Sequence, residues 1–116
     1  MYNITEFIDF VSEDGLYRKY RDFFVEGEMF PEHCVASKCW NIHSSSRMGE
    51  MINDSVLQHE EETFLKAPSS VLSETNIQAL KHLCEKIRLE YMGVDFGLTR
   101  DSQILLFEAN SGMRVN

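Results

Sequence analysis

The first third of the chain shows the residue types of short strands separated by turns. Residues 3–9, 16–25 and 29–37 are rich in β-branched and aromatic side chains and are separated by turn-forming residues, so they predict three strands. Pro31 cannot donate to a strand ladder, so the third strand is expected to start there, to bulge or to lie at an edge. Trp40, just beyond it, is interpreted as a core residue.

The middle of the chain changes to a helical spacing of apolar residues. Residues 48–66 follow this spacing and predict a helix that ends before Pro68. Ser73 is a plausible N-cap for a second helix, in which apolar residues recur at three- and four-residue steps from 77 to 87. Cys84 lies on that apolar face and is expected to be a core residue.

The last quarter of the chain returns to strands. Residues 91–99 and 103–109 predict two strands joined by a turn at 100–102. Strands joined by short turns pair in antiparallel fashion, and helices then cover one face of the sheet. The sequence therefore predicts one α+β domain over residues 1–116, with a mainly antiparallel sheet and two helices on one face.

Composition and charge narrow the classes of partner. The 116 residues carry 11 Lys plus Arg against 19 Asp plus Glu, a net charge of −8, which argues against a general nucleic-acid or anionic-membrane surface. The longest strongly apolar run, 104–107, is far too short for a membrane span. Three cysteines without a paired framework are typical of reduced thiols, and we expect a cytoplasmic location.

Two carboxylates and an amide stand out in the last two strands. Alternation places Glu108 and Asn110 on one face of their strand, and a turn near 100–103 brings Asp95 roughly opposite Glu108. Facing carboxylates repel unless a cation lies between them, and such oxygen ligands suit Mg²⁺. The pattern thus favours a metal site. The alternative is a solvated strand end followed by a turn.

A basic cluster marks the second predicted strand. Lys19 and Arg21 share one face by alternation, whereas Arg18 points to the other. An arginine in this position could bind a phosphate through two hydrogen bonds. The alternative is that these residues form a solvated strand face and pair with the acidic residues of the protein.

These segments together resemble the ATP-grasp superfamily. The ending "YMGVDFGLTRDSQILLFEANSGM" is similar to the C-terminal metal-binding hairpin of those enzymes, and "YRKYRDFFVEGEMFPEHCVASKCWNIH" is similar to the strand pair of RimK- and glutathione-synthetase-like members. The opening "ITEFID" resembles the strand after their interdomain hinge. The resemblance covers nearly the whole chain. It implies only the C-terminal part of an ATP-grasp unit, because the family's phosphate-binding lysines and Gly-rich lid are not found here.

The resemblance implies a set of metal and phosphate ligands. Asp95, Glu108 and Asn110 stand where the family holds Mg²⁺ on ATP phosphates. Arg21 matches the arginine that reaches the γ-phosphate and would be the catalytic residue, with assistance from Arg18 or Lys19.

The resemblance also implies a nucleotide position. Glu6, Phe7 and Ile8 would lie near the adenine and ribose, and Phe107 could pack against the adenine. The expected activity is that of an ATP- and Mg²⁺-dependent ligase, which activates a carboxylate as an acylphosphate and joins it to an amine or thiol. The alternative is a non-catalytic, truncated module that acts in binding or assembly. In either case we expect the isolated chain to self-associate through uncovered apolar surface.

Overall fold

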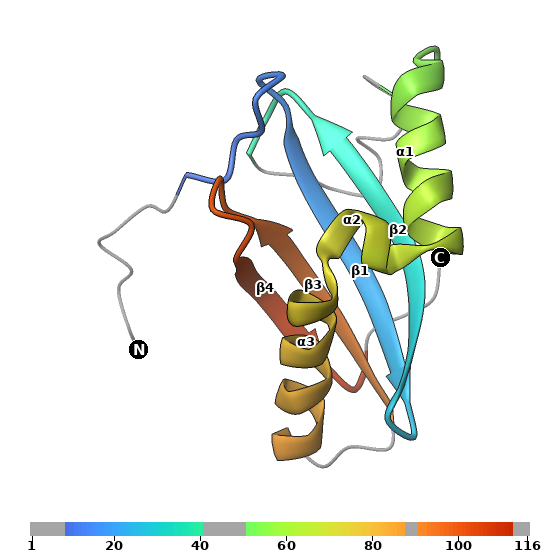
Figure 1. Ribbon diagram of the computed structural model, residues 1–116, viewed down its shortest axis with the longest axis vertical. Coiled ribbons are helices and arrows are strands. Elements are labelled where there is room, and N and C mark those ends of the chain that lie inside the picture. The colour runs from blue at the N-terminus through green and yellow to red at the C-terminus, as the bar shows by residue number, and fades with distance from the viewer. Residues whose placement is uncertain (1–8, 41–50, 88–90, 113–116) are drawn as a thin grey trace.

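A computed structural model of the chain describes residues 9–40, 51–87 and 91–112 (Figure 1). The first predicted strand, residues 3–9, lies almost entirely outside the described residues, as do Glu6, Phe7 and Ile8. Residues 9 and 10 are not part of a strand, and Val11 forms an isolated bridge with Tyr17.

Four antiparallel strands form a single sheet in the described residues. They are β1 (Tyr17–Val25), β2 (Glu28–Ser37), β3 (Tyr91–Leu98) and β4 (Ile104–Asn110). Their order across the sheet is β2-β1-β3-β4, so β1 and β3 are central. The two hairpins, β1–β2 and β3–β4, are therefore joined side by side through β1 and β3, which are far apart in the sequence. The expectation that Pro31 marks an edge or a bulge is confirmed, because it lies in edge strand β2 directly before the bulged residue Glu32.

The described part of the connection between the hairpins, residues 51–87, contains three helices rather than the two predicted. They are α1 (Ser55–Lys66), α2 (Pro68–Leu72) and α3 (Glu74–Ile87), and they lie over the sheet and beside β2 in Figure 1. The first helix begins at Ser55, because the Asp54 side chain caps it by accepting from two backbone N–H groups at 3.0 and 3.1 Å. Residues 51–54, predicted as helix, lie before α1, and residues 48–50 lie outside the described residues. The extra short helix starts with Pro68, since a proline at the first helical position loses no hydrogen bond.

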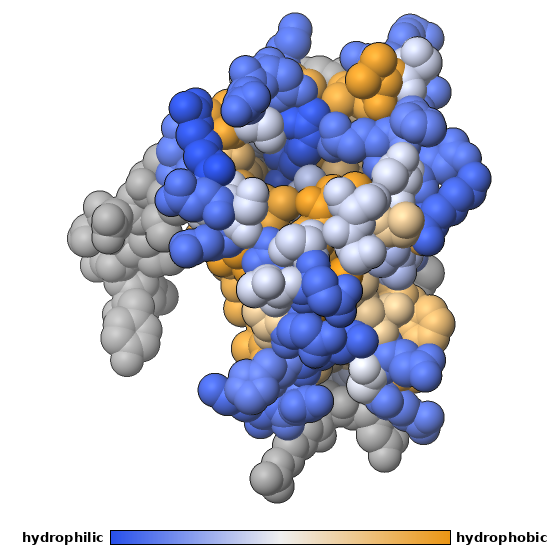
Figure 2. Space-filling model, viewed as in Figure 1, coloured by the Kyte–Doolittle hydropathy of each residue, from blue (hydrophilic) through white to orange (hydrophobic). Residues whose placement is uncertain are grey.

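The architecture is thus α+β, as predicted, with its main core between the sheet and the helices. That core joins the inward residues of β1, β2 and β3 to α1, α2 and α3, and its fully buried aromatic residues include Phe64 and Phe96. Figure 2 shows the molecule from the side of the helices. Hydrophilic residues predominate on this surface, and apolar side chains are visible between the helices. Cys84 is buried in this core, as expected, but Trp40 is 62% exposed, so its interpretation as a core residue is wrong.

The start of α3 also fixes the turn between β3 and β4. The Ser73 side chain accepts from the backbone N–H of Asn76 at 3.3 Å, which confirms its N-cap role. The buried Asn76 side chain then donates to the carbonyl oxygens of Leu72 at 2.7 Å and Ser102 at 2.6 Å. A single amide thereby ties the β3–β4 turn to the helical layer.

Candidate functional site

The candidate site lies on the sheet face opposite the main core, where charged residues of three strands meet. Asp95 of β3 pairs in register with Arg21 of β1 on one side and with Glu108 of β4 on the other. The predicted proximity of Asp95 and Glu108 is therefore confirmed. Asn110 pairs with Gly93, two residues before Asp95, and so lies on the same face.

Two β-bulges flank the Arg21–Asp95 pair. In β4 the register shifts between Phe96 and Asp95, which leaves Phe107 as the extra residue. Without that bulge, Phe107 rather than Glu108 would lie opposite Asp95. Bulges of this kind redirect side chains and are common beside functional sites. The second bulge leaves Glu32 of β2 unpaired next to Arg21.

Arg21 and Asp95 form a two-bond ion pair. Arg21 Nε donates to Asp95 Oδ1 at 2.7 Å, and Nη2 donates to Oδ2 at 3.0 Å. Both side chains are largely buried, with 13% and 5% exposed, and the hydrogen bond to Asp95 raises the pKa of Arg21. The charges of Glu32 and Glu108 act in the same direction. Lys19 Nζ lies 3.8 Å from Asp95 Oδ2 and adds a second cation.

Glu108 and Asn110 are exposed beside this buried pair. Asn110 Nδ2 donates to Glu108 Oε1 at 3.4 Å, and Asn110 Oδ1 accepts from the backbone N–H of Gly112 at 2.6 Å. The second bond holds the amide in place at the end of β4. Glu108 therefore presents its carboxylate to solvent next to an ordered amide group.

The donor set fits Mg²⁺ in chemistry. A carboxylate offers about four lone-pair positions, so Asp95 can accept from Arg21 and still ligate a cation. Among the described residues no group of three or more His, Cys, Asp or Glu side chains is placed to hold a metal. A metal here would thus depend on Asp95, Glu108, the Asn110 amide and ligands from phosphate or water.

Phe107 lies beside these ligands. Its ring contacts Phe10 edge-to-face at a centroid distance of 5.0 Å, and both rings lie over Gly97, two residues after Asp95 on the same face. Phe107 is 40% exposed, so part of the ring is accessible to a flat ligand. Glycine permits this close packing, because a Cβ at position 97 would lie 3.0 Å from Phe107 Cζ and 3.1 Å from the Phe10 ring, and the rings would have to shift by a few tenths of an ångström.

Arg18 is not brought to this site. It lies on the opposite face of β1, as alternation predicted, and binds Asp14 and Glu60 through hydrogen bonds of 2.5 to 3.0 Å. These two carboxylates raise the pKa of Arg18 and link β1 to α1. Its interactions are those of a residue that positions α1.

One buried acid was missed by the sequence reasoning. Asp22 is fully buried on the helix-covered face, and neither of its carboxylate oxygens has a hydrogen-bond partner among the described residues. Burial raises its pKa to about 7, and its charge adds to the burial that raises the pKa of Cys84 to about 11. The only sequence signal was its alternation with Tyr20 and Phe24, which predicts an inward direction.

Comparison with known proteins identifies no relative of this chain. No protein-family description, curated protein or solved structure matches the chain.

Proposed function

We propose that this chain is the C-terminal part of an ATP-grasp ligase unit and supplies its metal- and phosphate-binding residues. The observation that carries the proposal is the convergence of Asp95, Glu108 and Asn110 on one face, with Arg21 beside them. The reaction class is ATP-dependent joining of a carboxylate to an amine or thiol through an acylphosphate.

Each residue has a role that follows from its position. Asp95, Glu108 and Asn110 would hold Mg²⁺, which when bound neutralises charge on the ATP phosphates. Arg21 offers a fixed positive charge whose orientation is set by Asp95, and a preoriented cation stabilises charge that develops during phosphoryl transfer. Lys19 adds positive charge at the same carboxylate.

The nucleotide position is proposed from Phe107 alone among the described residues. Its partly exposed ring offers an apolar surface for adenine, beside the proposed phosphate site.

A second candidate function is a non-catalytic module that acts in binding or assembly. It is favoured by the ion pair itself, because Arg21 and Lys19 already compensate the charge of Asp95. In that case the charged face is structural and Glu108 is a solvated strand end.

A nucleotide titration separates the two candidates. We expect ATP with Mg²⁺ to shift amide resonances of β1, β3 and β4 around Arg21, Asp95 and Glu108 in ¹⁵N-labelled chain, and Glu108→Gln to abolish the shifts while the thermal midpoint stays unchanged. Glu85→Gln makes the same charge change on α3, on the other side of the sheet, and should bind as wild type. Equal binding by Glu108→Gln, or no Mg²⁺-dependent shift, would refute the metal assignment.

Location and assembly are part of the proposal. None of the helices within residues 9–40, 51–87 and 91–112 is long and apolar enough to cross a membrane. The three cysteines form no disulfide, which supports the proposed cytoplasmic location.

Self-association is supported by large exposed apolar side chains such as Phe30 and Val56. A monomeric mass by light scattering at all concentrations would contradict it.

A further inference from the structure

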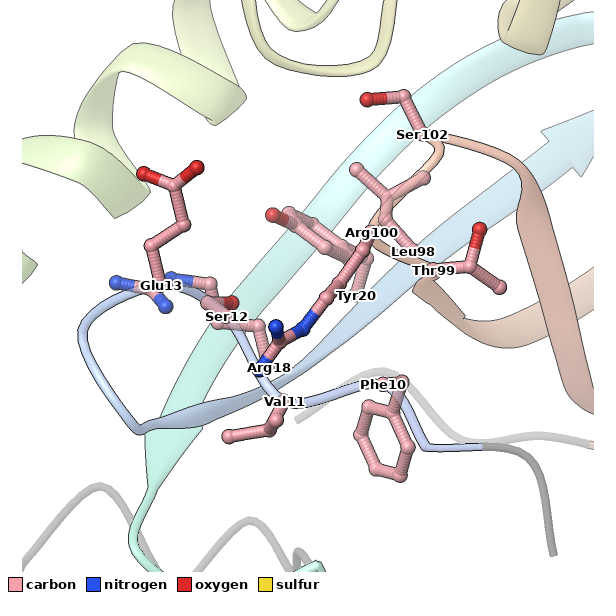
Figure 3. A pocket seen from close by; sticks show the side chains of 10 residues that line it. All are labelled: Phe10, Val11, Ser12, Glu13, Arg18, Tyr20, Leu98, Thr99, Arg100 and Ser102. Carbon is pink, nitrogen blue, oxygen red and sulfur yellow. The ribbon is translucent and has the colours of Figure 1, made fainter.

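A cavity lies at the opposite end of the β3–β4 hairpin from Asn110. Its volume is about 250 Å³, and it is bounded by the segment that leads into β1, by the start of β1 and by the β3–β4 turn (Figure 3). Phe10, Tyr20 and Leu98 supply its apolar surface. Ser12, Thr99 and Ser102 supply hydroxyl groups at the rim.

Both walls of this cavity are held by hydrogen bonds. On one side the Ser12 N–H donates to the Leu16 carbonyl at 2.8 Å, and Ser12 accepts from the Gly15 N–H at 2.9 Å. On the other side the Ser102 N–H donates to the Thr99 carbonyl at 2.9 Å, and the Ser102 carbonyl accepts from the buried Asn76 amide. The cavity is therefore formed before any ligand enters, which lowers the cost of binding.

Two arginines line the cavity, and they differ in their partners. Arg18 forms ion pairs with Asp14 and Glu60, so its charge is compensated. Arg100 has no hydrogen-bond or ion-pair partner among the described residues, Glu13 at the same rim included. In Figure 3 Arg100 extends from its turn toward Val11 and Ser12, while the Glu13 carboxylate points toward α1.

We propose that this cavity binds a small organic carboxylate with a short aliphatic chain. The carboxylate accepts from the Arg100 guanidinium, with the Ser12 hydroxyl as a further donor. The aliphatic chain rests on Phe10 and Leu98. An unpaired guanidinium above an apolar surface is the arrangement that a ligand with one anionic end and one apolar end complements.

The size and the location of the cavity define the ligand further. At about 30 Å³ for each water, the volume corresponds to about eight waters, which suits a chain of a few carbons. Leu98 and Tyr20 face the helices, whereas Asp95 and Glu108 lie on the other face of the sheet. The charged groups of the two sites thus lie on opposite faces of the sheet. The carboxylate site does not require a bound nucleotide, but the two sites adjoin through the rings of Phe10 and Phe107.

Sodium butyrate is the probe for this site. In ¹⁵N-labelled chain at constant ionic strength, butyrate should shift amide resonances of residues 10–13 and 98–102 in a saturable manner. Acetate lacks two methylene groups and should bind about fifteenfold more weakly, since each buried methylene contributes about 0.8 kcal/mol. Arg100→Gln should weaken butyrate binding at least about tenfold, as expected for loss of a charge-assisted hydrogen bond. Lys86→Gln, the same charge change at an exposed position near the end of α3, should leave binding unchanged.

The following results would contradict the proposal. No saturable shift with butyrate refutes the site, and equal binding by wild type and Arg100→Gln refutes the role of Arg100. Stronger binding of inorganic phosphate than of butyrate shows a simple anion site without use of the apolar surface. Loss of binding with Glu108→Gln would show that the shifts report the opposite face instead.

Discussion

The buried carboxyl of Asp22 makes the stability of this fold depend on pH in an unusual direction. Asp22 lies in central strand β1, fully buried against the helical layer and without a hydrogen-bond partner among the described residues. Its neighbour in β2 is Pro31, which has no N–H to offer. Removal of the Asp22 carboxyl from water is therefore not offset by hydrogen bonds, and it favours the neutral form of that carboxyl.

The magnitude follows from the pKa values. Folding raises the pKa of Asp22 from 3.8 to about 7, and each unit corresponds to about 1.4 kcal/mol, so the ionised form costs about 4 kcal/mol. Because the folded pKa is the higher one, this contribution to stability is complete below pH 3.8 and is lost as pH rises through about 7. Between pH 5 and pH 8 the expected loss is about 2 to 3 kcal/mol.

Urea unfolding of wild type and Asp22→Asn at several pH values isolates this effect, because asparagine does not titrate. The stability of wild type minus that of Asp22→Asn should fall by about 2 to 3 kcal/mol from pH 5 to pH 8. Asp101→Asn, the same substitution at an exposed turn position, is the matched control. A constant difference for Asp22→Asn would show that Asp22 ionises as easily in the fold as in the unfolded chain, and would refute the reasoning.

Three further predictions concern the site and its surroundings. Asp95→Asn should destabilise the fold by about 3 kcal/mol in urea unfolding, since it leaves the largely buried Arg21 charge without its carboxylate; a loss below about 1 kcal/mol would contradict this. Gly97→Ala should cost about 1 to 2 kcal/mol and alter the ring resonances of Phe107, because the new Cβ meets that ring at 3.0 Å; unchanged stability would contradict the close packing. Of the three thiols only Cys39 should react rapidly with a thiol reagent in native buffer, and the two buried ones only in urea, so rapid reaction of all three would refute the burial.

The local patterns were sufficient to predict the two hairpins, because turn residues and alternation act over a few positions. The β3–β4 turn and the approach of Asp95 to Glu108 follow from such short-range signals. The bulge at Phe107 could not be predicted, since nothing in an apolar run shows which residue is left unpaired. The short helix α2 could not be predicted from Pro68, because a proline ends the helix before it and also suits the first position of the helix after it.

The contacts that define the site depend on pairing between distant segments. Arg21 meets Asp95 across 74 residues, because β1 pairs with β3 and not only with its hairpin partner β2. Strand β1 carries charged and aromatic residues on both faces, so its sequence alone does not show which acid is buried. Asp22 and Arg21 are adjacent in sequence, yet Asp22 is buried without a hydrogen-bond partner among the described residues and Arg21 is ion-paired.

The Arg21–Asp95 pair also changes the physical argument for a metal. Facing carboxylates were expected to require a cation, but Arg21 and Lys19 already supply positive charge to Asp95. Charge compensation of Asp95 therefore does not distinguish a metal site from a structural ion pair. What distinguishes them is Glu108, which is exposed, is aligned with Asp95 by the Phe107 bulge and has the Asn110 amide beside it. Substitution of Asp95 would disturb both kinds of site, so Glu108→Gln is the variant that separates them.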